Sequence, residues 1–113
     1  MGLNINSAGE HTGWSHTSFT HLQERLAAVV GIDLGEMEGH GGAGKWDGLK
    51  DPLVPFLRQT SDGGELSPQD CFRVKQRIWE VTQNWPAEDQ AWARSLATLM
   101  AYAALRGGWM TWR

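Results

Sequence analysis

The sequence predicts a mainly α fold, a compact bundle of three to four helices with a small two-stranded sheet made by the chain termini. Apolar residues recur every three or four positions over three long stretches. Serine and proline stand where these stretches begin, and glycine or proline where they end. The chain of 113 residues has room for one core, so we expect a single domain over residues 1–113.

The first helix is predicted to begin after Ser15, which can cap its N-terminus. Trp14 and Phe19 flank this position at the spacing of a hydrophobic staple. Gly31 ends the predicted helix, after an apolar stripe formed by Phe19, Leu22, Leu26 and Val29.

A short second helix or turn is predicted over residues 51–58. Asp51 can cap it, and Pro52 suits the first helical position because that position needs no amide hydrogen. Pro55 falls within the first turn, where proline is tolerated.

The third helix is predicted to begin after Ser67, with Pro68 at the first position and Asp70 placed to complete a variant of the capping box. One face carries an apolar stripe, while Phe72 and Trp79, seven residues apart, either widen that face or form a second one. The stripe consists of Cys71, Val74, Ile78, Val81 and Trp85.

Pro86 is expected to end the third helix and to open a fourth, which runs to a glycine stop at Gly107. The two ends of the chain, GLNINS at residues 2–7 and GWMTWR at residues 108–113, alternate between apolar and other residues over short runs. We expect them to pair as the two-stranded sheet.

Composition narrows the class of function. The formal net charge of −3 supplies no basic field for nucleic acid or anionic membranes, so neither is expected as a partner. Cys71 is the only cysteine, which rules out an intramolecular disulfide. Residues 1–30 contain no apolar run of signal-peptide length, and no segment is long enough to cross a bilayer, so a cytoplasmic protein is expected.

The glycine-rich stretch at residues 39–48 carries Gly39, Gly44 and Lys45 at the spacing of a phosphate-binding loop. Trp46 stands where such a loop needs serine or threonine, and no apolar strand precedes it. Two interpretations stay open. The glycines could let a tight crossover seat Trp46 in the core, or the loop could bind a small anion, with candidate residues Gly39, His40, Gly44, Lys45, Arg73 and Arg77.

Candidate metal and catalytic groups are scattered. His11, His16 and His21 are five residues apart, whereas a metal pair on a helix needs a spacing of four. Residues 59–70 match the frame of a calcium loop, but most ligand positions lack a carboxylate. No signature of a nucleophile with its base occurs. We therefore expect no metal, no cofactor and no catalytic residue, and keep a histidine-dependent metallohydrolase as the weakest alternative.

Seven tryptophans in 113 residues are the most unusual feature of the composition. Several of them lie at helix ends or at the C-terminus, where complete burial is difficult. Exposed aromatic side chains beside arginines are typical of protein–protein hot spots. The predicted interaction residues are Trp85, Trp109, Trp112, Arg106 and Arg113.

Three segments resemble a group of small uncharacterised actinobacterial proteins, in part associated with phages, to which no activity is assigned. The shared elements are W-S-x-x-x-F at residues 14–19, G-G followed by W-D within residues 41–47, and S-D-G-x-E-L-S-P-x-x-C at residues 61–71. The resemblance implies a compact, mostly helical unit and supplies no catalytic residue.

Together these observations predict a small non-catalytic binding protein. A module that blocks or neutralises a partner protein, such as an immunity protein or a phage-encoded inhibitor, is the leading hypothesis. The alternative is a small-ligand binder that holds phosphate or a nucleotide at residues 39–48.

Overall fold

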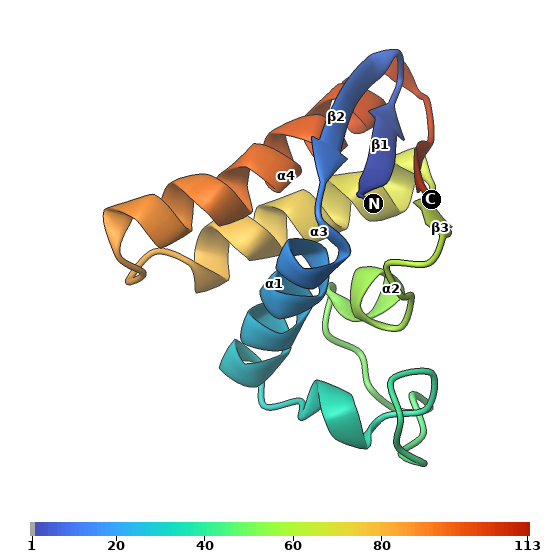
Figure 1. The fold of residues 1–113 in the computed structure, drawn as a ribbon. Helices are drawn as coiled ribbons and strands as arrows, with labels where there is room; N and C mark the ends of the chain where they lie inside the picture. The colour runs from blue at the N-terminus through green and yellow to red at the C-terminus, as the bar shows by residue number, and fades with distance from the viewer. Residues whose placement is uncertain (1) are drawn as a thin grey trace.

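The computed structural model describes residues 2–113. Four α-helices, one short 3₁₀ helix and four strands follow one another along the chain (Figure 1). In chain order they are β1 (Leu3–Ser7), β2 (Glu10–Trp14), α1 (His16–Val29), η1 (Leu34–Glu36), α2 (Val54–Leu57), β3 (Gly64–Leu66), α3 (Pro68–Val81), α4 (Ala87–Arg106) and β4 (Met110–Trp112). Across this described range, no helix has the length and apolar character needed to traverse a bilayer.

The prediction of a mainly α fold with a two-stranded sheet is wrong, because the protein has a mixed α and β architecture. The two ends of the chain do pair, with Ile5 opposite Trp112. However, β2 and β3 extend them to a four-stranded antiparallel sheet in the order β2-β1-β4-β3. The two added strands gave no clear pattern in the sequence, because β3 has only three residues and β2 has none that is fully buried.

The β1–β2 hairpin also turns through an unexpected pair of residues. Ala8 and Gly9 have φ angles of 52° and 96°, the left-handed region that two-residue hairpin turns require and that Asn-Gly normally supplies. Alanine carries no sequence signal for such a turn.

The start and end of α1 are confirmed. The Ser18 amide donates to Ser15 Oγ at 3.0 Å, and the rings of Trp14 and Phe19 meet edge to face with centroids 6.4 Å apart. Gly31 follows the helix with a φ of 81°. The staple therefore fixes the angle at which the chain leaves β2 and enters α1.

Two predicted helix boundaries are corrected. The short helix α2 spans only four residues within the predicted range 51–58, because Asp51 caps a preceding turn by accepting from the Leu53 amide. The helix α3 ends at Val81 and does not reach Trp85. Thr82 follows the helix, and its amide and hydroxyl both donate to the Ile78 carbonyl in the last turn.

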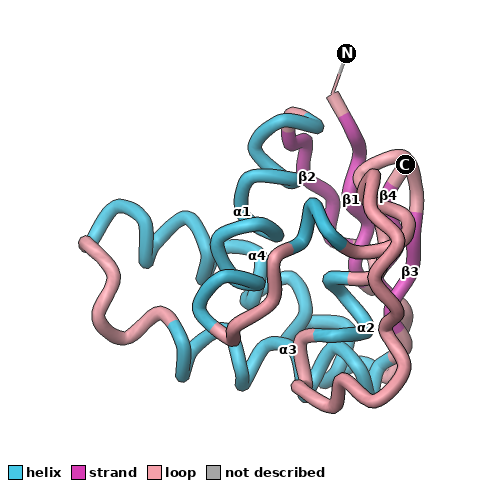
Figure 2. The backbone as a smooth tube through the Cα atoms, turned by 90° about the horizontal axis from the view of Figure 1, so that it is seen from below, coloured by secondary structure: helices cyan, strands magenta, loops and turns pink. Residues whose placement is uncertain are grey.

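The helices α3 and α4 run side by side as a hairpin (Figure 1). Gln90, near the start of α4, donates from its amide to the Thr82 carbonyl at 3.0 Å and closes the connection. At the other end Gly107, with a φ of 67°, terminates α4 as predicted. Figure 2 shows the strands gathered at one side of the molecule.

Trp112 lies at the centre of the core between the sheet and the helices. Its ring centroid is 5.3 Å from that of Phe19 in α1 and 6.0 Å from that of Phe56 in α2. Its indole N–H donates to the Thr60 carbonyl at 2.8 Å. Gly64 in β3 has no room for a side chain, because a Cβ there would lie 2.4 Å from the Trp112 ring.

The N-cap of α3 provides a test of the packing. The Asp70 amide donates to Ser67 Oγ at 3.1 Å, so Ser67→Ala is expected to lower the free energy of unfolding by about 1 kcal/mol, measured by urea denaturation. Ser95→Ala is the matched control, since Ser95 is exposed inside α4, where alanine is the better helix former. Equal losses in the two variants would contradict the assignment of Ser67 as the cap.

Candidate interaction surface

The outward face of α3 carries two large aromatic side chains. Phe72 and Trp79 are each 47% exposed. Seven residues turn an α-helix through about two full circles, so the two rings lie on one line along the helix, about 10 Å apart. The buried stripe of Cys71, Val74 and Ile78 occupies the other side. The two aromatics therefore form a second face, which is one of the two outcomes that their spacing allowed.

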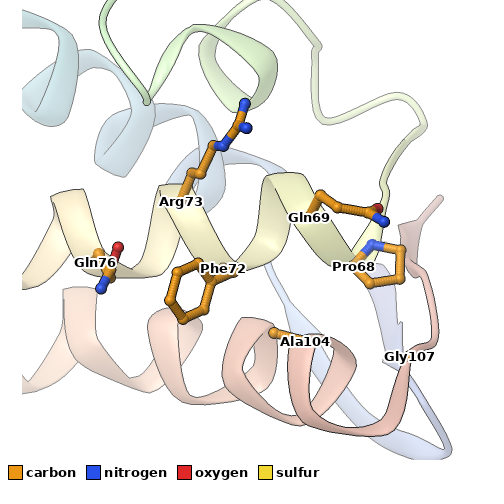
Figure 3. A pocket seen from close by; sticks show the side chains of 7 residues that line it. All are labelled: Pro68, Gln69, Phe72, Arg73, Gln76, Ala104 and Gly107. Atoms are coloured by element: carbon orange, nitrogen blue, oxygen red, sulfur yellow. The ribbon is translucent and has the colours of Figure 1, made fainter.

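A groove of about 760 Å³ runs between this face and α4 (Figure 3). In Figure 3 the Phe72 ring points toward α4, where small residues leave the groove open, while Arg73 points away from α4. Leu105 of α4, which follows the lining residue Ala104 in the chain, is 84% exposed. We call this feature the α3–α4 groove; its lining residues are Pro68, Gln69, Phe72, Arg73, Gln76, Ala104 and Gly107.

Two cations lie over the aromatic rings of this surface. Lys75 Nζ is 4.8 Å from the centroid of Phe72, and the Arg94 guanidinium carbon is 3.9 Å from that of Trp79. Arg94 also donates to the Trp79 carbonyl. Within residues 2–113, neither these two cations nor Arg73 forms an ion pair. The rim of the groove is therefore positive.

Of the predicted interaction residues, Trp109 is exposed and Trp112 is not. Trp109 is 53% exposed and lines a second hollow beside β3 with Arg58. The expected exposure of Trp112 is wrong, since only 2% of it is accessible. Because β4 lies between β1 and β3, the inward-facing side chain of its last residue enters the core.

The other three predicted interaction residues are engaged within the chain. Trp85 is half-buried beneath Arg25, whose guanidinium lies 4.0 Å from the ring centroid. Arg106 donates to the Ala8 carbonyl at 3.0 Å and pairs with a carboxylate of β2. The backbone of Arg113 exchanges two hydrogen bonds with Asn4, which extends the pairing of the chain ends.

The glycine-rich loop forms its own internal contacts. Lys45 Nζ pairs with a Glu38 carboxylate oxygen at 3.0 Å, and the Trp46 indole donates to the Glu38 carbonyl. His40 Nε2 donates to the Leu57 carbonyl at 2.8 Å. The Gly44 amide donates to the Glu36 carbonyl. These contacts support the interpretation in which the glycines allow a tight crossover.

The structure does not gather the remaining anion-binding candidates around that loop. Arg77 pairs with Asp51 at 3.1 Å and with Glu80 at 3.4 Å, and the hydrogen bonds that its guanidinium donates to Asp51 raise its pKa. Arg73 extends from α3 beside the α3–α4 groove. Gly39 has a φ of 89°, so it serves the turn of the backbone.

The histidines have separate neighbours. His16 Nδ1 lies 3.0 Å from Ser61 Oγ, and His21 stacks on Trp92 with centroids 5.8 Å apart. In residues 2–113, no three histidine, cysteine or acidic side chains are close enough to share a metal ion. The segment that matches the frame of a calcium loop, residues 59–70, forms a turn into β3, in which the Gln59 side chain bonds both backbone groups of Glu65.

Cys71 is a core residue of α3. It is fully buried, and burial raises the pKa of its thiol to about 12. A thiol in this environment stays protonated near neutral pH and is a poor nucleophile.

Phe72, Trp79 and Leu105 were not among the predicted interaction residues. The spacing of Phe72 and Trp79 carried the signal, because both fall off the buried stripe of their helix. Nothing in the sequence distinguishes Leu105, since it continues the apolar composition of α4.

The close approach of the glycine loop can be tested by two substitutions. A Cβ at Gly42 would lie 2.2 Å from the Glu36 carbonyl, whereas one at Gly35 meets nothing nearer than 3.7 Å. Gly42→Ala is therefore expected to lower the free energy of unfolding by about 1–3 kcal/mol. Gly35→Ala is the control and should change it by less than about 0.5 kcal/mol in the same thermal denaturation series. A stable Gly42→Ala variant would contradict this role for the glycine.

The burial of Cys71 predicts its reactivity. Because the folded-state pKa is raised to about 12, the native thiol should not react with a disulfide reagent such as DTNB at pH 8, and it should react fully in guanidinium chloride. Absorbance of the released thiolate measures both. Rapid labelling of the native protein would show that the thiol is reachable and ionised.

Comparisons with protein-family models, curated proteins and solved structures found no significant match for this chain. The function is therefore inferred from the surfaces and contacts of the molecule.

Proposed function

We propose that this chain is a non-catalytic protein-interaction module that blocks or neutralises a partner protein in the cytoplasm, in the manner of an immunity protein or a phage-encoded inhibitor. One observation carries the proposal. Exposed apolar side chains concentrate on α3, α4 and the segment after α4, where Phe72, Trp79, Leu105 and Trp109 are each at least 47% exposed.

Exposed apolar side chains are unfavourable in free energy, and a partner that covers them would remove this contribution. Transfer of apolar surface from water contributes roughly 25 cal/mol per Å², and aromatic residues with nearby arginines are enriched in the energetic centres of interfaces. Because Ala104 and Gly107 are small, the groove has space beside the Phe72 ring for a partner side chain. The surface thus combines anchors with a cavity next to them.

Three of the groups that could perform chemistry have structural roles. The Cys71 thiol is buried in α3. His16 tethers α1 to the Ser61 hydroxyl, and His40 tethers the glycine loop to α2. These contacts support a role in binding.

The proposal predicts a partner that depends on the aromatic pair. The wild-type protein and a Phe72→Ala/Trp79→Ala variant are immobilised and exposed to lysate of the cells that make the protein. A retained protein is then identified by mass spectrometry, purified, and titrated by calorimetry. We expect the double variant to weaken its binding at least tenfold, because loss of one anchor at an interface centre costs about 2 kcal/mol or more.

The matched control is Val29→Ala/Leu49→Ala, which removes two exposed apolar side chains from outside α3 and α4. It should bind the partner like the wild type, and all variants should keep the wild-type circular dichroism. Equal binding by the aromatic variant and the control would contradict the proposed surface. Capture of a phosphate or nucleotide in place of a protein, with a rise in melting temperature on its addition, would favour the glycine loop.

A further inference from the structure

We infer that the partner lays an acidic amphipathic helix into the α3–α4 groove. This inference rests on the proposed function and specifies the chemistry of the partner. Two features carry it. One is the spacing of Phe72, which lines the groove, and Trp79, two turns further along α3. The other is the group of cations beside these rings, Arg73, Lys75 and Arg94, which form no ion pair within residues 2–113.

The spacing of the anchors matches a helix. Phe72 and Trp79 are separated by about 10 Å along α3, which is two helical turns. A partner helix laid along the groove presents apolar side chains at the same interval when they occupy positions i, i+3 or i+4, and i+7. The hollow beside Ala104 receives one of them.

The charge of the rim specifies the polar residues of that helix. Within residues 2–113, the basic residues outside this region that pair with carboxylates are Arg25, Lys45, Arg77 and Arg106. Lys50, Arg58 and Arg113 form no ion pair within this range either, but they lie outside the groove. Near the groove, Arg73 is one of the lining residues, and Lys75 and Arg94 lie over the rings of Phe72 and Trp79. The acids of α3 are Asp70, which lines a separate hollow with Arg73, and Glu80, which is already bonded to Arg77. The three cations near the groove therefore form no ion pair within residues 2–113, although the formal net charge of the sequence is −3.

Other anionic partners fit this surface less well than a peptide. Stacking of a nucleobase needs a free aromatic face, and Arg94 covers one face of Trp79 at 3.9 Å. A polyanion such as DNA or a charged bilayer interacts with the whole protein, whose overall negative charge opposes it. A short helix contacts only the groove, so the charge around the groove, and not the net charge of the protein, determines whether the helix binds.

A peptide-display selection tests this inference without a known partner. A library of 16-residue peptides is selected on the full-length wild-type protein and depleted on the Phe72→Ala/Trp79→Ala variant. We expect enriched sequences to be acidic, with apolar residues at the helical spacing given above. Their affinity, measured by fluorescence anisotropy, should fall at least tenfold with Arg73→Glu/Lys75→Glu and should weaken as salt rises, since charge pairs at a rim are screened.

Arg58→Glu/Arg113→Glu is the matched control, because it changes the net charge equally at two exposed arginines that form no ion pair within residues 2–113 and do not line the groove. It should leave peptide affinity within about twofold of the wild type. Single-stranded DNA and phosphatidylserine vesicles are titrated in parallel and should not bind.

Three results would overturn the inference. Enrichment of neutral or basic peptides would show that the groove does not select acids, and the proposed interaction surface would stand if the captured partner still needed Phe72 and Trp79. Failure to enrich any peptide that depends on these rings would exclude a helix as the occupant. Binding of DNA or vesicles that is lost with Arg73→Glu/Lys75→Glu would assign the cations to a polyanion.

Discussion

Among the side chains described above, that of Trp112 links the largest number of helices, strands and turns. Its strand is hydrogen-bonded on both sides, to β1 and to β3. Its ring meets Phe19 of α1 and Phe56 of α2, and its indole N–H reaches the Thr60 carbonyl. One residue therefore links the sheet, two helices and the turn before β3, and the exclusion of a side chain at Gly64 follows from its size.

The position of the candidate surface follows from this arrangement. The sheet and α1 cover the inner sides of α3 and α4, where Val74, Ile78 and Met100 are fully buried. Phe72 and Trp79 cannot reach that core, because they lie on the other side of α3. The hairpin is held by the packing of α3 against α4 and by the bond from Gln90 to the Thr82 carbonyl. A surface built on two packed helices is presented in one geometry, which reduces the entropy lost when a partner binds.

Local signals in the sequence predicted the helices well and the sheet poorly. Ser15, Ser67 and Gly107 act at the helix ends as expected, because caps depend on residues that are neighbours in the chain. The burial of Trp112 depends on pairing between segments far apart in the sequence, which no local pattern encodes. The strand β2 pairs with its neighbour β1, but its turn at Ala8 and Gly9 and its lack of buried residues gave no strand signal. The site was found in part: the spacing of Phe72 and Trp79 was readable, whereas the cations over their rings come from tertiary packing.

The strand order β2-β1-β4-β3 also bears on how the chain reaches its native state. Its two inner strands come from opposite ends of the sequence, so the contact between Ile5 and Trp112 spans nearly the whole chain. Contacts of such long range slow folding, because the loop that they close must lose its entropy first. During synthesis the β1–β2 hairpin and β3 can join into one sheet only after β4, which lies between β1 and β3, has been made. The α3–α4 hairpin, whose contacts are local, is complete before that strand emerges.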